Sequence, residues 1–316
     1  MKIAVLTSGG DAPGMNAAIR AIVRAGIAEG HEMFGIMDGY RGLLEDRFIP
    51  LSAKDVSGML SIGGTKLGTA RVSEFKEIPV QMVAIDNLRN RGIDALIVIG
   101  GDGSYRGAQA LHELEFQTIA IPGTIDNDVY GTDYTIGFHT ALNTIVEAID
   151  KLRDTSSSHR RCSIIEVMGR TSGDLALYAG ICGGAEFIIT PENPINKDKL
   201  ISTLKKHNEE GRRHAIIVVT EQQFDVHKLA AEISIKSGFS SRATVLGYIQ
   251  RGGTPIAEDR ILASRMGAFA VDMLTKGVSG QCVGIKDDKL VTSPLSDIIN
   301  HPKERVELYD LIKKLR

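Results

Sequence analysis

Short apolar runs alternate along this chain with segments in which apolar residues recur at helical spacing. Several runs are rich in β-branched residues and show little polar alternation, as in parallel strands that are covered on both faces. The predicted strands are Lys2–Leu6, Ala95–Ile99, Thr118–Ile121, Ser163–Val167, Phe187–Thr190, Ala215–Thr220 and Thr244–Leu246.

Between these runs, apolar residues fall three or four positions apart, which predicts helices with one buried face. The two clearest stripes lie within residues 138–152 and 15–23. Repeated strand–helix–strand units favour right-handed crossovers and doubly wound sheets. The tail, Asn300–Arg316, is predicted to form a charged terminal helix, and the sequence assigns no chemistry to it.

Composition narrows the class of protein. The chain has 316 residues, which suggests two domains at roughly 150 residues each. Apolar residues make up 43% and charged residues 24%, values that exclude a disordered or collagen-like chain. A net charge of −2 provides no basic surface for nucleic acid.

No apolar run approaches the roughly 20 residues of a membrane span, and the N-terminus lacks the apolar core of a signal peptide. Three cysteines without CxxC spacing argue against a disulfide framework or a zinc site. We therefore expect a soluble, cytoplasmic protein without nucleic-acid or membrane partners.

Glycine is enriched, with 34 residues in 316, and it concentrates where predicted strands end. Three clusters each contain an aspartate: residues 7–16, 100–104 and 122–128. Ligands of open α/β sheets bind at the carboxyl ends of strands, where glycine lets backbone N–H groups approach a phosphate. One such cluster could equally be a tight turn, but three favour phosphate binding. The spacing is neither GxGxxG nor GxxxxGK[ST], which disfavours a dehydrogenase or a Walker-type ATPase.

Charged residues in these loops suggest phosphoryl transfer. Asp102 suits a magnesium ion that bridges nucleotide phosphates, and the loop of Asp126 and Asp128 suits a base that accepts a hydroxyl proton. The alternative is that these residues only cap helices and close turns. Five arginines in or beside glycine-punctuated loops suggest a substrate that carries its own phosphate. They are Arg71, Arg161, Arg170, Arg242 and Arg251.

Over essentially its whole length the chain resembles the bacterial ATP-dependent 6-phosphofructokinases. The motifs that carry the resemblance are LTSGGDAPGMNAAIR at 6–20, GGTKLGTAR at 63–71, VIGGDGS at 98–104, PGTIDND at 122–128, IDKLRDTSSSH at 149–159, EVMGR at 166–170, RATVLGYIQRGGTP at 242–255 and DRILASRMGA at 259–268. Lipid and NAD kinases resemble GGDG alone but lack PGTIDND and MGR.

The resemblance implies two doubly wound, Rossmann-like α/β/α sandwich domains with the active site in the cleft between them. A larger domain, residues 1–138 plus 250–300, would bind ATP and Mg²⁺. A smaller domain, residues 139–249 plus 301–316, would bind fructose 6-phosphate. The implied reaction transfers the γ-phosphoryl group of MgATP to the 1-hydroxyl of D-fructose 6-phosphate, which yields fructose 1,6-bisphosphate and ADP in the committed step of glycolysis.

The resemblance also implies roles for individual residues. The ATP-binding set would be Gly10, Arg71, Val72, Gly101, Asp102, Gly103 and Ser104, with Asp102 holding Mg²⁺. Asp126 would be the catalytic base, and Arg71, Thr124 and Arg170 would complete the catalytic set. The residues in contact with fructose 6-phosphate would be Thr124, Ile125, Asp126, Asp128, Arg161, Met168, Gly169, Arg170, Glu221, Arg242, Tyr248, Ile249, Gln250 and Arg251. In the implied homotetramer, Arg161 and Arg242 would reach the site of a neighbouring subunit.

Two small residues bear on the phosphoryl donor. Pyrophosphate-dependent relatives resemble GGDD and PKTIDND, whereas this chain has Gly103 and Gly123, which favours ATP. The alternatives are a pyrophosphate-dependent or other sugar-phosphate kinase of the same fold and, more distantly, a nucleotide sensor without catalysis. Tyr248 stands where the family usually has histidine, and a tyrosine hydroxyl can still donate to a phosphate oxygen.

The regulatory site that binds ADP or phosphoenolpyruvate in the family is matched incompletely. The matching residues are Arg20, Arg24, Arg153, Glu186, Arg212, Arg213 and His214. Ala53, Gly58 and Glu210 stand where arginine, aspartate and lysine are common. Exchanging a cation for an anion near a phosphate reverses an interaction of about 4 kcal/mol at 4 Å and an effective dielectric of 20, before screening.

We therefore predict that allosteric control by ADP and phosphoenolpyruvate is weakened or lost. The measurement is fructose 6-phosphate saturation with ATP, repeated in the presence of each effector, and the curves are expected to change little. A strong loss of sigmoidicity on addition of ADP would contradict the prediction.

Overall fold

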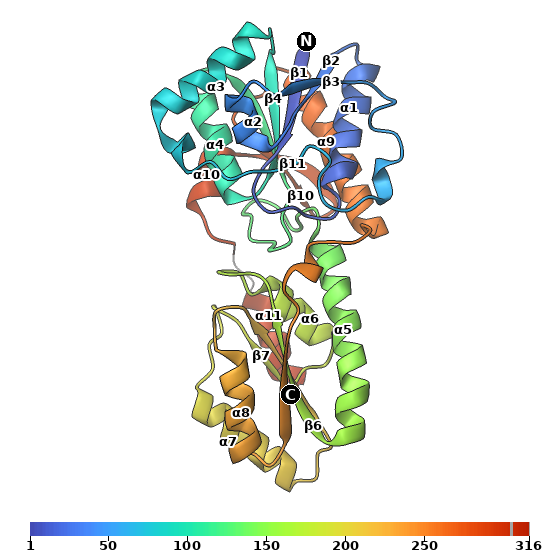
Figure 1. Ribbon diagram of the computed structural model, residues 1–316, viewed down its shortest axis with the longest axis vertical. Coiled ribbons are helices and arrows are strands. Elements are labelled where there is room, and N and C mark those ends of the chain that lie inside the picture. The colour runs from blue at the N-terminus through green and yellow to red at the C-terminus, as the bar shows by residue number, and fades with distance from the viewer. Residues whose placement is uncertain (304–305, 316) are drawn as a thin grey trace. The chain divides into compact units, whose positions relative to one another are not determined.

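The computed structural model describes residues 1–303 and 306–315 and divides the chain into two compact units (Figure 1). Unit 1 comprises Met1–Thr140 and Arg251–Lys303. Unit 2 comprises Ala141–Gln250 and the C-terminal segment, of which residues 306–315 are described. Residues 304, 305 and 316 of the predicted smaller domain lie outside the described residues.

Unit 1 is built on a seven-stranded sheet with the order β11-β10-β5-β4-β1-β2-β3. The strands are β1 (Lys2–Thr7), β2 (Glu32–Ile36), β3 (Phe48–Leu51), β4 (Ala95–Gly100), β5 (Gln117–Pro122), β10 (Gln281–Lys286) and β11 (Lys289–Pro294). The five inner strands are mutually parallel, and each edge strand is antiparallel to its neighbour. Thr7 pairs with Ile99 and Gly100 with Pro122, so that β1, β4 and β5 end at the same edge.

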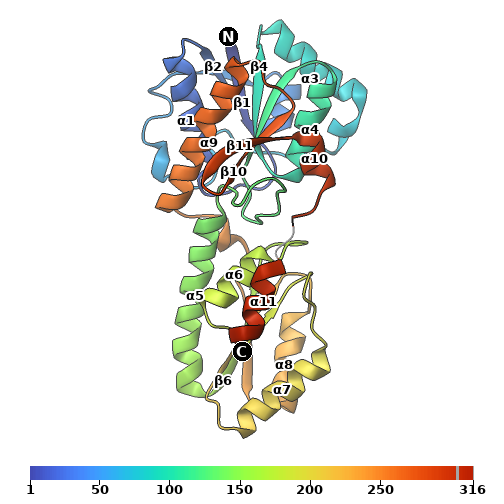
Figure 2. The same ribbon diagram turned by 180° about the vertical axis from the view of Figure 1, so that it is seen from behind.

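Helices cover both faces of this sheet. They are α1 (Met15–Ala28), α2 (Gly39–Leu44), α3 (Ile78–Asn90), α4 (Asp102–Glu113), α9 (Ala257–Thr275) and α10 (Leu295–Asn300), with 3₁₀ turns at η1 (Met59–Ser61) and η2 (Ser73–Lys76). Figures 1 and 2 show α1 and α9 on one face and α3 and α4 on the other. The residues of β4 are buried throughout, as the absence of polar alternation predicts.

Unit 2 contains a four-stranded parallel sheet with the order β7-β8-β6-β9. Its strands are β6 (Arg161–Val167), β7 (Phe187–Ile189), β8 (Ala215–Thr220) and β9 (Ser240–Val245). Its helical segments are α5 (Phe138–His159, which starts at the end of unit 1), α6 (Asp174–Cys182), α7 (Lys197–Glu209), α8 (Val226–Lys236), η3 (Gly247–Gln250) and α11 (Val306–Leu315). The apolar faces of α7 and α8 pack on one side of the sheet. On the other side, the Ser156 hydroxyl of α5 bonds that of Ser163 on β6 at 2.6 Å.

These two sandwiches confirm the predicted doubly wound α/β class. The predicted strand Thr244–Leu246 is displaced, because β9 starts at Ser240 and is largely polar, as its position at the sheet edge permits. The tail helix predicted over Asn300–Arg316 is confirmed only in part: residues 301–303 are not helical, and α11 spans Val306–Leu315. Within the described part of the chain, no helix is long and apolar enough to cross a membrane.

Asp259, in the first turn of α9, is fully buried and holds the start of α5. Its Oδ1 accepts a hydrogen bond from Gly137 N at 2.9 Å, and its Oδ2 accepts from Thr140 N at 2.7 Å and from Thr140 Oγ1 at 2.6 Å. The first N–H groups of a helix have no partners within the helix, and a carboxylate is favourable at this positive end of the helix dipole. One side chain therefore fixes where α5 begins.

Replacing Asp259 by alanine is expected to lower the free energy of unfolding by about 2–4 kcal/mol, because three buried donors lose their acceptor. The midpoint of urea unfolding is the measurement. The matched control is Glu258→Ala, which removes an exposed carboxylate from the same turn and is expected to change stability by less than about 0.5 kcal/mol. Equal midpoints for the two variants would contradict this account of Asp259.

Candidate active site

The three glycine clusters meet at one edge of the unit 1 sheet, after β1, β4 and β5. Ser8 N donates to Ile99 O at 2.9 Å, and Gly123 N donates to Gly100 O at 2.9 Å, so the loops are bonded through their backbones. A Cβ atom on Gly100 would lie 2.5 Å from Ser8 O. Glycine is needed at position 100 because neighbouring main chains are in contact there.

The segment at 62–71 lies against the β1–α1 loop. The Thr7 hydroxyl bonds Thr65 Oγ1 at 2.8 Å and Gly68 O at 2.7 Å, and Thr69 Oγ1 donates to Gly9 O at 2.8 Å. Asn16 of α1 holds the start of the segment, since its amide donates to Gly63 O at 3.1 Å. The structure therefore brings the GGTKLGTAR segment beside the first glycine cluster. This segment ends at Arg71, and Val72 follows it; both are predicted ATP residues.

Arg251 also reaches the first cluster, although it lies 240 positions further along the chain. Its Nη1 donates to Asp11 O at 3.2 Å, and a Cβ on Gly10 would overlap the guanidinium group. Gly10 thus leaves room for an arginine predicted to bind substrate.

The second cluster opens helix α4, and its Asp102 is the first helical residue. The Asp102 carboxylate is 57% exposed and accepts two hydrogen bonds from Arg106 at 3.2 Å. Ser104 is buried, and its hydroxyl has no hydrogen-bond partner among the described residues. A Cβ on Gly103 would have no atom within 4 Å, so the start of α4 is uncrowded.

A magnesium ion fits Asp102 as a single protein ligand. Mg²⁺ is usually held by one or two carboxylates, substrate phosphates and water rather than by a cage of side chains. Within residues 1–303 and 306–315, no group of three or more His, Cys, Asp or Glu residues is placed to hold a metal ion. An exposed carboxylate at the start of a helix that itself favours phosphate suits this shared form of coordination.

The third cluster is a tight turn in which Asn127, rather than an aspartate, supplies the turn chemistry. Asn127 has a φ of 51° and is fully buried, and its Oδ1 accepts from Thr135 N at 3.0 Å and from Lys303 Nζ at 3.1 Å. Asp126 is 3% exposed, and its backbone N donates to Thr124 Oγ1 at 3.2 Å. The sequence left open whether this loop closes a turn or supplies a functional acid. In the structure Asn127 closes the turn, and Asp126 beside it is the candidate acid.

Gly123 of this cluster is tightly surrounded, in contrast to Gly103. A Cβ at position 123 would lie 2.9 Å from Ile99 Cγ2 and 3.2 Å from Met15 Cε. A larger residue here requires the β4 and α1 side chains to move.

In unit 2 the structure brings together the EVMGR loop, Glu221 and Gln250. Met168 N donates to Gln250 Oε1 at 3.1 Å, and Arg170 N donates to Glu221 Oε1 at 3.2 Å. Gln250 is fully buried, whereas the neighbouring Tyr248 is 82% exposed and Ile249 is 60% exposed.

The loop has strained backbone at two successive positions. Gly169 has a φ of 138° and Arg170 a φ of 50°. Glu166, just before the loop, has its pKa raised by burial and by the nearby Glu221. The predicted sugar-phosphate loop is therefore held through its backbone and lies beside two acids.

Arg161 and Arg242 are not brought to this loop within unit 2. Arg161 starts β6, while Met168 follows its end, so a strand of seven residues, about 20 Å long, separates them. Arg242 pairs with Ser163 across β6 and β9, which places both arginines on the face covered by α5. Within unit 2, both arginines therefore lie towards the opposite end of β6 from the loop.

The predicted effector residues are divided between the units. Arg20 and Arg24 lie on α1 of unit 1, whereas Arg153 of unit 2 contacts His214 Nε2 at 3.2 Å and donates to the carbonyls of Gly183 and Gly184 after α6. The remaining residues of the set are Glu186, which accepts from Ile216 N at 2.6 Å, Glu210, which lies 3.7 Å from Lys206 Nζ, and the exposed Arg212 and Arg213. Part of this set therefore stabilises unit 2 itself.

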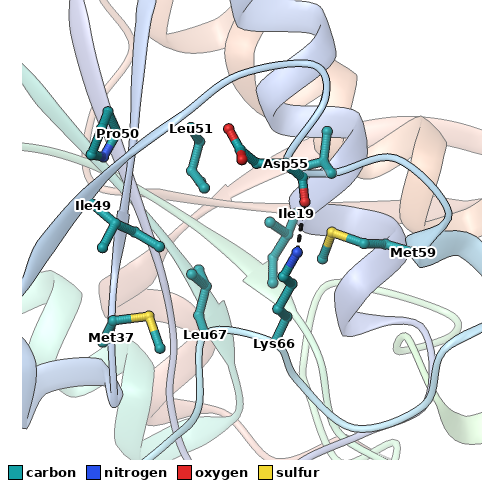
Figure 3. A pocket seen from close by; sticks show the side chains of 10 residues that line it. Ile19, Met37, Ile49, Pro50, Leu51, Asp55, Met59, Lys66 and Leu67 are labelled. Carbon is teal, nitrogen blue, oxygen red and sulfur yellow. Dashed lines mark hydrogen bonds between the residues drawn. The ribbon is translucent and has the colours of Figure 1, made fainter.

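A cavity of about 320 Å³ lies elsewhere in unit 1 (Figure 3). Eight of its ten lining residues are apolar, and Lys66 Nζ donates across it to Asp55 O at 2.7 Å. No residue of the predicted ATP or substrate sets lines it. Its apolar walls do not suit a phosphate, so the glycine-lined edge remains the candidate site.

Sequence reasoning missed the residues that support these loops. Asn16 and Thr7 fix the 62–71 segment, and Lys303 bonds both Asn127 and Asp133 O. Asn127 stands inside the PGTIDND motif and could have been singled out as a turn former. Lys303 lies far along the chain in a charged tail, and no local signal marks it.

The fold and the loops define a two-unit α/β protein whose glycine-rich loops meet at the carboxyl edge of a parallel sheet. Residues 2–274 match the model of the phosphofructokinase family. The chain belongs to that family.

Solved structures agree with this assignment. A phosphofructokinase from Saccharomyces cerevisiae is 38% identical with a TM-score of 0.85, and the match covers 99% of this chain and 46% of that one. Pichia pastoris phosphofructokinase in the T-state is also 38% identical, with a TM-score of 0.88, and the match covers 99% of this chain and 36% of that one. This chain thus spans less than half the length of either relative.

A pyrophosphate-dependent phosphofructokinase from Marinobacter aquaeolei shares the fold. It is 22% identical with a TM-score of 0.87, and the match covers 100% of this chain and 91% of that one. The fold alone therefore does not distinguish between phosphoryl donors.

Proposed function

We propose that this protein transfers the γ-phosphoryl group of MgATP to the 1-hydroxyl of fructose 6-phosphate. The observation that carries the proposal is the convergence of three glycine loops, with Asp102 at the start of α4 and Asp126 in the neighbouring buried turn. Membership of the phosphofructokinase family supports the same reaction.

In the proposed complex, backbone N–H groups and the N-terminus of a helix bind the phosphates of ATP. Glycines of the first two clusters expose N–H groups to the phosphates, and the N-terminus of α4 favours their negative charge. Asp102 would hold Mg²⁺, which neutralises charge on the phosphate oxygens when bound. Arg106, which now bonds Asp102, is a cation that the metal would replace as the partner of this carboxylate.

The chemical step needs a base and a set of cations. Asp126 would accept the proton of the 1-hydroxyl as its oxygen attacks the γ-phosphorus in line. Arg71 would offset the charge that spreads over the transferred group. Arg170 and Arg251 would bind the 6-phosphate through their guanidinium groups, whose planar donors match phosphate oxygens.

The side chains around the second and third clusters favour ATP over pyrophosphate. Gly103 leaves open space at the start of α4, where a nucleotide can lie uncrowded. Gly123 is enclosed by Ile99 and Met15, so this chain has no room for the lysine found in pyrophosphate-type motifs.

The proposed active form is a homotetramer. The separation of Arg161 and Arg242 from the Met168–Arg170 loop supports it, because two cations that bind the sugar phosphate would then come from a neighbouring subunit. Regulation by ADP or phosphoenolpyruvate is expected to be weak, since Arg153 and Glu186 already bond the backbone of unit 2.

The phosphoryl donor is tested in a coupled assay that follows fructose 1,6-bisphosphate formation. We expect turnover with MgATP and little or none when pyrophosphate replaces it, because Gly103 leaves the start of α4 open and the surroundings of Gly123 leave no room for the lysine of pyrophosphate-type motifs. Equal turnover with the two donors would contradict ATP dependence, and no turnover with either would contradict the proposed function.

Replacing Asp126 by asparagine is expected to reduce kcat by about 10²–10⁴-fold, because the amide cannot accept the hydroxyl proton. ATP affinity, measured by calorimetry, is expected to stay unchanged. Asp86→Asn, an exposed residue of α3, is the matched control and should retain full activity. A D126N enzyme with near-normal kcat would remove Asp126 from the role of base.

A further inference from the structure

The C-terminal helix α11 carries a tyrosine whose hydroxyl is fixed between two side chains. Tyr309 Oη lies 2.7 Å from Thr190 Oγ1 and donates to Glu192 Oε2 at 3.2 Å. Thr190 is fully buried, and its Oγ1 accepts from Asn193 N at 3.1 Å. The single proton of Tyr309 is directed at Glu192, and the Thr190 hydroxyl therefore donates to the tyrosine oxygen.

The helix that presents Tyr309 is docked on unit 2. Ile312 of α11 is buried, and α11 packs against α6, as both views show (Figures 1 and 2). Burial raises the pKa of Tyr309, so its hydroxyl stays protonated and remains a donor. A helix for which the sequence predicts only a charged surface thus provides a fixed hydrogen-bond donor.

Glu192 links Tyr309 to the loop that precedes α6. Its second oxygen, Oε1, accepts from Gly173 N at 3.0 Å. A Cβ at Gly173 would lie 2.5 Å from Glu192 Oε2, so glycine allows the carboxylate to rest against the backbone. Glu192 is exposed, and an exposed glutamate occupies many rotamers unless partners hold it. Tyr309 and Gly173 hold it from both sides.

Gly173 ends the loop that contains Met168, Gly169 and Arg170. The loop closes on itself where Ser172 N donates to Gly169 O at 2.8 Å. The left-handed backbone at Arg170 is strained and persists only when surrounding contacts enforce it. Glu221 holds the loop at Arg170 N, and Glu192 holds it at Gly173 N. Two carboxylates therefore fix the backbone of this loop at two points.

We propose that Tyr309 and Glu192 are positioning residues for the fructose 6-phosphate loop: Tyr309 fixes Glu192, and Glu192 fixes the loop backbone through Gly173 N. The inference rests on the proposed function, because it assigns the loop to the sugar phosphate. Neither side chain needs to touch the substrate, and the ATP loops belong to the other unit. Loss of either side chain therefore weakens binding of the sugar phosphate more than it affects ATP or the chemical step.

The test is steady-state kinetics of the full chain with four variants. Tyr309→Phe and Glu192→Ala are each expected to raise KM for fructose 6-phosphate by about 3- to 10-fold, with kcat within twofold and KM for ATP unchanged. Glu192→Gln keeps an oxygen for Gly173 N and is expected to restore most of the affinity. In the double variant Y309F/E192A, KM should be no higher than in E192A, because the tyrosine acts through the glutamate.

Leu311→Ala is the matched control, since it alters an exposed apolar side chain of the same helix. It is expected to leave KM unchanged. A Y309F enzyme with wild-type KM, or one with reduced kcat and unchanged KM, would overturn the proposal, because the second result indicates only a loss of folded protein. Additive effects of Y309F and E192A on KM for fructose 6-phosphate would also contradict the proposal that Tyr309 acts through Glu192.

Amide hydrogen exchange separates this inference from the proposed function. Y309F is expected to speed exchange in peptides spanning 168–173 and to leave β6 protected, whether or not the enzyme phosphorylates fructose 6-phosphate. Unchanged exchange at 168–173 overturns the positioning role. Wild-type protein without turnover, but with faster exchange in Y309F, would overturn the function and leave the contact established.

Discussion

The arrangement of unit 1 depends on main chains that touch where three parallel strands end. The loops after β1, β4 and β5 are bonded backbone to backbone, and at Gly100 and Gly123 a side chain would collide with a neighbour. This constraint places Asp102 and Asp126 on adjacent loops. It also explains why glycine is enriched in a chain whose apolar and charged fractions are ordinary.

Carboxylates have two different uses in this molecule. Asp259, Glu192 and Glu221 each accept hydrogen bonds from backbone N–H groups and thereby fix a helix start or a loop. Asp102 is instead exposed at a helix start, and its partner is the exposed side chain of Arg106. The acids that fix a loop or a helix start are hydrogen-bonded to backbone N–H groups. The acid proposed to bind the metal is instead hydrogen-bonded to an arginine side chain.

The sequence predicted six strands and the glycine loops because their signals are local: β1, β4 and β5 in unit 1, and β6, β7 and β8 in unit 2. Runs such as Ala215–Thr220 are fully buried and show no alternation of polar and apolar residues, so their strand pattern is clear in the sequence. The strands β2, β3, β10 and β11 of unit 1 were not predicted, and β9 was displaced. β3 contains Pro50, and β9 begins with two serines and an arginine, which an edge position tolerates. In the candidate site, motif residues could be named, but their supports could not. Lys303 and Tyr309 act across more than 100 positions of sequence, and only the folded chain reveals such contacts.

The contrast between Gly103 and Gly123 has an evolutionary consequence. Open space at position 103 means that an added Cβ meets no neighbouring atom, so a substitution there needs no change elsewhere. Position 123 is enclosed by Ile99 and Met15, and a larger residue requires compensating changes in β4 or α1. Substitution at these two positions is therefore ordered by epistasis: a side chain fits at the first without other changes, whereas the second accepts one only after the side chains around it have changed.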